Sequence, residues 1–148
     1  MKRRSRWTFL ATAGVLLLAG CHAPGEPDSQ GRSRPRIHYL EIVCRDVATE
    51  CSGLERIHGV RFGPPLADLG QARVAELPDG SLIGVRAPLA EHEQPVSRTY
   101  LEVADIASAV AEAEAAGGEI AYPPTRQGDT GTWAIYFLGD VPVGLWQR

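Results

Sequence analysis

Cysteine and histidine are scarce in this chain. Its 148 residues include three cysteines and four histidines. A structural zinc site needs four such ligands, arranged as pairs a few residues apart. No two pairs stand at that spacing, so we expect no metal and no other cofactor.

An excess of positive charge is also absent. Four basic residues lie at positions 2, 3, 4 and 6, and the rest of the chain has 11 basic against 18 acidic residues, a formal charge of −7. Proteins that bind nucleic acid present a basic patch to the phosphates. This composition therefore argues against a nucleic-acid partner.

The third absence is an apolar run long enough to cross a membrane. The run from Trp7 to Leu18 is shorter than the about 20 residues that a spanning helix needs. It follows the basic residues and ends on small residues before Cys21, which is typical of a secretory signal and its processing site. Residues 1–20 are therefore predicted to be a signal peptide.

The stretch Leu18-Ala19-Gly20-Cys21 resembles the lipobox of bacterial lipoproteins, in which the cysteine is acylated, with palmitate for example, and the chain is cut before it. The resemblance implies a lipid on Cys21 and a domain held at a membrane of the cell envelope, outside the cytoplasm. His22 follows in place of Asp, which favours the outer membrane in a Gram-negative cell. The alternative is an ordinary secretory signal with an incidental cysteine. Residues 21–36, rich in Pro, Gly, Ser and charge, are predicted to be a flexible tether.

The remaining residues, 37–148, suit one compact domain. Apolar alternation, helix caps and turn residues predict two modules, about 37–88 and 97–148, each with the order βαβββ. The predicted strands are Ile37–Cys44, Val60–Phe62, Ala72–Leu77 and Leu82–Arg86, then Thr99–Val103, Glu119–Tyr122, Trp133–Leu138 and Val143–Gln147. The predicted helices follow Asp46 and Asp105 as caps, and they end at Gly59 and at Gly117-Gly118.

Two observations bear on how the modules are built. The triplet Tyr39-Leu40-Glu41 recurs as Tyr100-Leu101-Glu102 at the same place in each module, which indicates an internal duplication. Cys44 lies late in a predicted strand and Cys51 early in the following helix, so we expect both to face the layer between sheet and helix. Export would allow a disulfide between them, and the alternative is two buried thiols that act as small hydrophobic residues.

Two βαβββ modules in one chain resemble the vicinal oxygen chelate superfamily, which includes glyoxalase I, bleomycin-resistance proteins and extradiol dioxygenases. The resemblance covers Ile37 to Arg148 and is carried most clearly by Tyr100–Ile106, Ala115–Gly118 and Gly144–Gln147. It implies an α+β fold, in which an eight-stranded mixed sheet forms an open cup with the helices on its outer face. A homodimer is compatible with this fold.

Members of this superfamily that use a metal hold it on four side chains, one from each of four strands of the cup. The matching positions here are Tyr39, Arg98, Gly144 and the segment Ile83–Val85, none of which is a usual ligand. His38 lies one residue from such a position, so alternation turns it to the opposite face and favours a structural role. We therefore expect no bound metal.

The same alternation selects the residues that face the cup. Seven of them form the predicted ligand site: Tyr39, Glu41, Arg86, Arg98, Tyr100, Glu102 and Trp146. Charged groups would orient a small molecule and aromatic rings would supply contact area. The alternative is a closed polar network, in which Arg98, Glu41 and Glu102 pair with one another and fill the cup.

Three functions are consistent with this sequence. The first is a membrane-tethered domain that binds a small molecule in its cup without metal. The second is a lyase or isomerase of the glyoxalase type, and the third is a module of the envelope that binds another protein. Ser81 and Ser97 have no His at a telling spacing, so no nucleophile with its base is predicted.

Overall fold

The computed structural model describes residues 35–148, and the predicted signal peptide, the lipid site at Cys21 and the tether up to residue 34 lie outside them. The elements follow in the order β1 (Ile37–Val43), α1 (Val47–His58), β2 (Pro65–Leu66), a 3₁₀ turn η1 (Ala67–Leu69), β3 (Ala72–Glu76), β4 (Leu82–Arg86), β5 (Val96–Glu102), α2 (Ile106–Ala115), β6 (Glu119–Gln127), β7 (Gly131–Leu138) and β8 (Val141–Gln147). No helix within residues 35–148 is long and apolar enough to cross a membrane.

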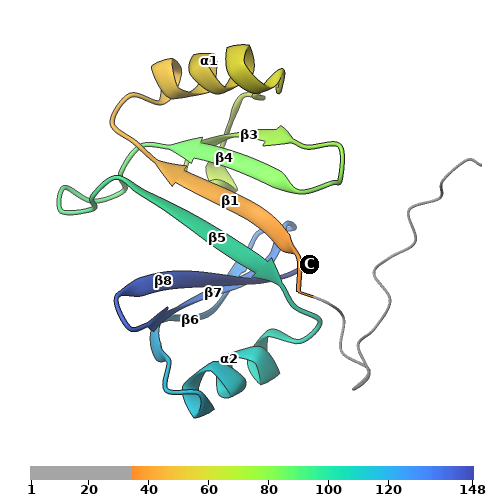
Figure 1. The fold of residues 1–148 in the computed structure, drawn as a ribbon, viewed down its shortest axis with the longest axis vertical. Helices are drawn as coiled ribbons and strands as arrows, with labels where there is room; N and C mark the ends of the chain where they lie inside the picture. The colour runs from red at the N-terminus through yellow and green to blue at the C-terminus, as the bar shows by residue number, and fades with distance from the viewer. Residues whose placement is uncertain (1–34) are drawn as a thin grey trace, which may run out of the picture.

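The strands form one open mixed sheet in the order β2-β3-β4-β1-β5-β8-β7-β6. β1 runs parallel to β4, β5 runs parallel to β8, and β1 and β5 meet antiparallel at the centre. Each half thus repeats the same arrangement, with α1 over one half and α2 over the other (Figure 1). The predicted α+β fold of two βαβββ modules is confirmed.

The two helices begin where the sequence places their caps. The carboxylate of Asp46 accepts a hydrogen bond from the Thr49 N–H at 3.0 Å, and Asp105 accepts one from the Ser108 N–H at 2.6 Å. Gly59 ends α1 in the left-handed conformation, at φ 70°, which costs a glycine little. Capped ends and one apolar face each are enough to fix both helices on the outer side of the sheet.

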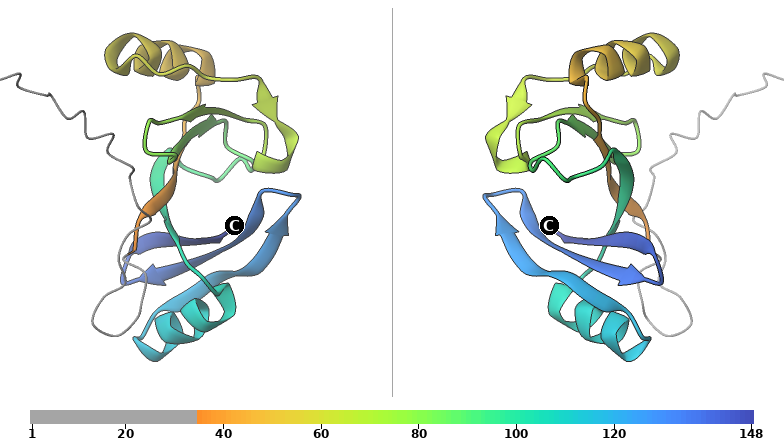
Figure 2. Two further views of the ribbon diagram at one scale, coloured as in Figure 1. Left: turned by 90° about the vertical axis from the view of Figure 1, so that its right-hand side faces the viewer. Right: turned by 90° about the vertical axis from the view of Figure 1, so that its left-hand side faces the viewer.

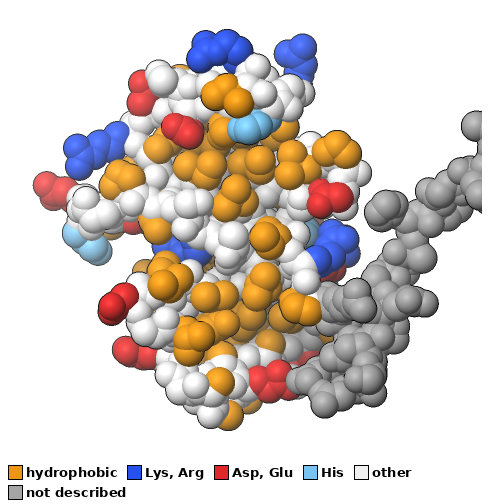
Figure 3. All heavy atoms as spheres, in the orientation of Figure 1, with side chains coloured by type: hydrophobic (Ala, Val, Ile, Leu, Met, Phe, Trp, Pro, Cys, Tyr) orange, Lys and Arg blue, Asp and Glu red, His pale blue; other side chains and the backbone are white. Residues whose placement is uncertain are grey.

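Apolar residues between each helix and the sheet form two separate cores. Cys51, Phe62, Ala75 and Val85 are buried beneath α1, and Ile106, Ala134 and Leu145 are buried beneath α2. Between the helices the outer face carries further apolar side chains (Figure 3), among them Leu40 and Ile42 beside α1.

The two cysteines of the first module are free thiols. Cys51 is completely buried, Cys44 is partly buried against the same core, and burial raises the pKa of both thiols. The disulfide between them is therefore wrong for this structure. The alternative, in which both act as small hydrophobic residues, describes what is seen.

Three predicted strands differ from the observed ones by three residues or more. The segment Val60–Phe62 is not a strand, because the Phe62 N–H donates to the Glu55 carboxylate at 3.0 Å and Arg73 Nε donates to the Gly63 carbonyl at 3.0 Å. Pairing starts later, at Pro65–Leu66, which lies between two of the predicted strands. β5 begins at Val96 in place of Thr99. β6 continues past Tyr122 to Gln127 and contains two prolines, which an edge strand tolerates because the N–H on its outer side needs no partner.

The sheet curves strongly, so that its two edges approach each other (Figure 2). The turn between β6 and β7 comes close to η1, since a side chain added at Gly128 would touch the Asp68 carboxylate. The two edges of the sheet therefore meet near Gly128 and Asp68.

Candidate functional site: the cavity inside the curved sheet

The centre of the cup is lined from the two central strands. Tyr39 on β1 is paired with Tyr100 on β5, and Glu41 is paired with Arg98 two residues further along the strands. The two tyrosine rings lie 5.6 Å apart, and the Trp146 ring packs against both, at 5.7 and 5.8 Å between centroids. The alternation predicted from the sequence for these residues is thus confirmed.

Each tyrosine ring rests on a glycine of the neighbouring parallel strand. A Cβ at Gly84 on β4 would overlap the Tyr39 ring, and a Cβ at Gly144 on β8 would overlap the Tyr100 ring. The two pairs occupy equivalent places in the two modules. They form an aromatic floor, in which Tyr39, Gly84 and Gly144 lie at positions where the sequence comparison with metal-dependent proteins of this fold expected ligands.

This floor does not fit a divalent metal. Burial, with the neighbouring Glu41 carboxylate, raises the pKa of both Tyr39 and Tyr100 far above the usual phenol range, so both hydroxyls keep their protons. Within residues 35–148 no group of three or more His, Cys, Asp or Glu side chains is arranged to hold a metal ion. The floor itself offers two protonated hydroxyls and the apolar surfaces of the rings.

A cavity of about 590 Å³ lies above this floor. Six of the seven predicted site residues line it: Tyr39, Glu41, Arg86, Arg98, Tyr100 and Trp146. Sequence analysis missed the other large side chains that line it: Leu69, Leu89, His92, Glu93, Tyr122, Gln127, Trp133, Ile135 and Phe137. The volume lies within the range of about 300–1,000 Å³ that small-molecule sites occupy.

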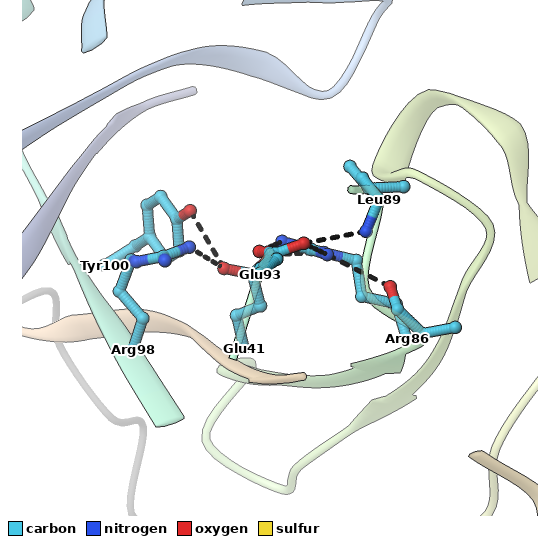
Figure 4. A network of polar contacts seen from close by, with 7 residues as sticks. Glu41, Arg86, Leu89, Glu93, Arg98 and Tyr100 are labelled. Carbon is cyan, nitrogen blue, oxygen red and sulfur yellow. Dashed lines mark hydrogen bonds and ion pairs between the residues drawn. The ribbon is translucent and has the colours of Figure 1, made fainter. Parts of the chain in front are cut away.

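Charged residues of the cavity wall form one network of polar contacts (Figure 4). The Glu41 carboxylate accepts hydrogen bonds from Arg86 Nε at 2.6 Å, from Arg98 Nη1, and from the Tyr100 hydroxyl at 3.2 Å. All three donors are buried or nearly so. Glu41 therefore holds both arginines of the cavity in place.

Glu93 is bound to the other side of Arg86. Its carboxylate accepts from Nη1 at 2.8 Å and from Nη2 at 2.7 Å, and it also accepts from the Leu89 N–H at 2.7 Å. These hydrogen bonds, those from Arg86 foremost, lower the pKa of Glu93 to about 2. Glu93 comes from residues 87–95, which connect β4 to β5 and lie largely between the two modules predicted from the sequence. Residues 87–95 form no helix or strand, so no periodic pattern in the sequence predicts the ion pair between Arg86 and Glu93. The only signal was that a glutamate lies close to Arg86 in the sequence.

Glu102 lies apart from the cavity. It binds Arg148 through Nε at 2.8 Å and Nη2 at 2.5 Å, and Arg36 Nε lies 2.7 Å from its other oxygen. The predicted alternative of a closed network among Arg98, Glu41 and Glu102 is therefore wrong. The observed network joins Arg98 and Glu41 to Arg86 and Glu93, and Glu102 is not part of it. The cup is also not filled, as the cavity shows.

Strict alternation predicted that His38 faces the outer side of the sheet, and this prediction is wrong. The register of β1 against β5 shifts between Ile37 and Tyr39, and this bulge turns His38 toward Trp146, with 5.4 Å between the ring centroids. Its side chain is buried, which lowers its pKa, and its Nδ1 has no hydrogen-bond partner among residues 35–148. Packing against Trp146 agrees with the structural role that we expected.

The arrangement divides the cavity into two chemically different ends. Trp133, Trp146 and Tyr122 line it on one side of the tyrosine floor, with 5.7 Å between the Tyr122 and Trp133 rings. Trp133 is paired with Trp146, and Trp146 is paired with Glu102 on β5. Glu102 lies four residues along β5 from Arg98, which is paired with Glu41, so the two tryptophans and the charged pair lie at different levels of the sheet. Such a cavity suits a molecule with a flat apolar body and a polar group at one end.

No protein-family model matches the sequence, and no curated protein matches it significantly. Several solved structures share its fold. A hypothetical protein from Bacillus halodurans C-125 superposes with a TM-score of 0.64 at 13% identity, covering 77% of this chain and 94% of that one. Methylmalonyl-CoA epimerase from Mycobacterium tuberculosis gives 0.61 at 16% identity, with coverages of 76% and 87%.

A variant of methylmalonyl-CoA epimerase from Streptomyces coelicolor, solved in complex with 2-nitronate-propionyl-CoA, gives a TM-score of 0.56 at 18% identity and covers 76% of this chain and 96% of that one. Identities this low establish the fold alone. The described part of this chain therefore shares the fold of methylmalonyl-CoA epimerase, an open mixed sheet of two βαβββ modules.

Proposed function

We propose that this chain is a membrane-tethered binding protein that holds a small carboxylic acid in its cup without metal. The observation that carries the proposal is the two-ended cavity, in which a buried charged cluster lies at one end and aromatic rings lie at the other. The ligand's apolar body would lie against Trp133 and Trp146. Its carboxylate would lie at the charged end.

Arg98 is the proposed anchor for the carboxylate. Its Nη1 donates to Glu41, and its Nε is buried without a hydrogen-bond partner among residues 35–148. Its Nη2 donates to no group of these residues and is therefore the donor left for a ligand. Arg86, by contrast, is bonded through all three of its nitrogens. A guanidinium keeps its charge at any physiological pH and offers a planar set of donors that matches a carboxylate.

The test is a titration of the protein with 3-phenylpropionate, followed by tryptophan fluorescence, with the neutral 3-phenylpropionamide as the matched ligand. We expect the acid to bind at least about tenfold more tightly than the amide. Arg98→Met should weaken binding of the acid by about 1.5–3 kcal/mol, the contribution of a hydrogen bond to a charged group. Arg126→Met, which changes a largely exposed arginine, is the control. Equal binding of acid and amide would refute the anchor.

An isomerase of the glyoxalase type is the second candidate. The observation that favours it is a carboxylate, Glu41, placed at the end of the cavity beside a tyrosine hydroxyl. Against it stand the three donors already bound to Glu41, because a proton taken from a substrate would have to displace one of them. Incubation with methylmalonyl-CoA in D₂O, followed by mass spectrometry, tests this candidate. Deuterium uptake with the wild type that is lost in Glu41→Gln would favour catalysis over binding.

A module that only binds another protein is the least supported candidate, because it gives no role to the cavity. The membrane tether is part of the proposal and rests on the sequence of residues 18–21. Cells that express the protein would be labelled with a palmitate probe. We expect label on the wild type and none on Cys21→Ser, whereas equal labelling of both would contradict lipid attachment at this cysteine.

A further inference from the structure

The charged end of the cavity contains two arginines, and only one of them has a donor to spare. Arg86 donates through Nε to Glu41, through Nη1 to Glu93 and to the Ala87 carbonyl at 3.1 Å, and through Nη2 to Glu93. Its side chain is almost completely buried. An anionic ligand could reach Arg86 only where Glu93 now lies.

Glu93 makes the contacts that a bound carboxylate would make. Its two oxygens meet the two Nη atoms of Arg86 as a fork, and one of them also takes the Leu89 N–H. This geometry is the common way in which proteins recognise free carboxylates. Both Arg86 and Glu93 line the cavity, so the contact is made at its wall (Figure 4).

The connection that carries Glu93 is folded around this contact. Within residues 87–95 the Glu93 N–H donates to the Ala90 carbonyl at 3.0 Å, which closes a tight turn. The Leu89 N–H then points at the same carboxylate. The carboxylate site on Arg86 is thus built partly from the segment that fills it.

The net charge of this cluster limits how many carboxylates a ligand can bring into the cavity. Arg86 and Arg98 carry two positive charges, and Glu41 and Glu93 carry two negative charges. The cluster is therefore neutral as a whole. One ligand carboxylate can use the spare donor of Arg98, but a second carboxylate would be desolvated beside two glutamates without a donor of its own.

We propose that Glu93 is a specificity-determining residue that occupies a second carboxylate site, formed by Arg86 and the Leu89 N–H, and thereby restricts the cup to ligands with a single carboxylate. This inference rests on the proposed function, because it assumes that the cup binds an acid. Removal of Glu93 would free Arg86 and leave a net positive charge. The preference would then move toward dicarboxylates.

Two matched acids test the proposal on the full chain. 3-Phenylpropionate and phenylsuccinate share a phenyl ring and a carbon chain and differ by one carboxylate. We expect the wild type to bind phenylsuccinate at least about tenfold more weakly than 3-phenylpropionate. Glu93→Ala should tighten phenylsuccinate by about tenfold, the effect of one charge-assisted interaction, and should change 3-phenylpropionate less than about threefold.

Glu91→Ala is the control, because Glu91 lies in the same connection with an exposed side chain. It should leave both affinities and their ratio unchanged. If Glu93→Ala proves too unstable to titrate, Glu93→Gln removes the charge and keeps the volume, and it should shift the ratio in the same direction. An unchanged ratio in a folded Glu93 variant would overturn the proposal, even if the wild type binds the monoacid well.

A second measurement decides the matter if neither aromatic acid binds, an outcome that counts against the proposed function and not against the second site. Acetate is added to Glu93→Ala, and the melting temperature is followed at constant ionic strength, with chloride as the reference salt. We expect a saturable rise for Glu93→Ala and none for the wild type or Glu91→Ala. The absence of any acetate-specific rise would show that Arg86 and the Leu89 N–H do not form a carboxylate site.

Discussion

Arg86 joins two glutamates that would otherwise be separate, and its removal should be far more damaging than removal of Arg98. Arg86→Met leaves the Glu41 carboxylate with Arg98 and Tyr100, and it leaves Glu93 with the Leu89 N–H alone. Loss of one partner from a buried ion pair costs about 3–5 kcal/mol. Since Glu93 is partly accessible to water, we expect about 3 kcal/mol for Arg86→Met.

Arg98→Met should be milder. Glu41 keeps Arg86 Nε and the Tyr100 hydroxyl after this change, so its charge stays compensated. We expect a loss of about 1–2 kcal/mol, in the range of one hydrogen bond to a charged group. Urea unfolding at pH 7, followed by fluorescence, gives both free energies of unfolding. Arg126→Met is the surface control and should stay within about 0.5 kcal/mol of the wild type.

The reasoning can be checked with a second substitution in the same cluster. If Arg86→Met is costly because it strands Glu93, then Glu93→Gln in the Arg86→Met background should recover part of the loss. Glu93→Gln alone should destabilise the wild type. Equal losses for Arg86→Met and Arg98→Met, or no recovery in the double variant, would refute the role of Arg86 as the centre of the cluster.

Three further predictions follow from the packing, the pKa values and the cysteines. Gly84→Ala should lower the free energy of unfolding by about 1–3 kcal/mol, because the new methyl group meets the Tyr39 ring. Gly53→Ala, in open space on α1, is the control and should raise it by up to about 1 kcal/mol. Equal effects would contradict the contact between Gly84 and Tyr39. The lowered pKa of Glu93 adds stability that is complete above its ordinary pKa of 4.5 and is lost as the pH falls toward about 2. Glu93→Gln should therefore reduce the fall in unfolding free energy between these pH values. An unchanged fall would contradict the lowered pKa. Alkylation under denaturing, non-reducing conditions should modify both Cys44 and Cys51, and mass spectrometry would reveal a linked peptide pair if this is wrong.

The parts of the fold that could be predicted are those fixed by local rules. Asp46, Asp105 and Gly59 act as caps in the structure as the sequence indicates, because capping depends only on neighbouring backbone groups. The facing of Tyr39 and Tyr100 follows from simple alternation in regular strands. Residues governed by short-range chemistry are thus placed correctly without knowledge of the whole.

The parts that could not be predicted depend on contacts between distant segments or on irregular backbone. The bulge that turns His38 toward Trp146 breaks alternation at one residue, and no residue type in the sequence signals it. The segment after Gly59 is held by side chains of Glu55 and Arg73, which favour a loop over the strand that its apolar residues suggest. Glu93 was missed because a polar connection between modules is usually solvated, and here its carboxylate is returned to the cavity by a turn.

The contact of Glu102 with both Arg36 and Arg148 brings the two ends of the folded domain to one carboxylate (Figure 1). A short linker could therefore join residue 148 to residue 36, and new ends could be opened within residues 87–95. Each module brings its own helix and its own pair of parallel strands, so this circular permutant should rebuild the same sheet with the modules in exchanged order. It would release the segment that carries Glu93 while the aromatic floor stays intact.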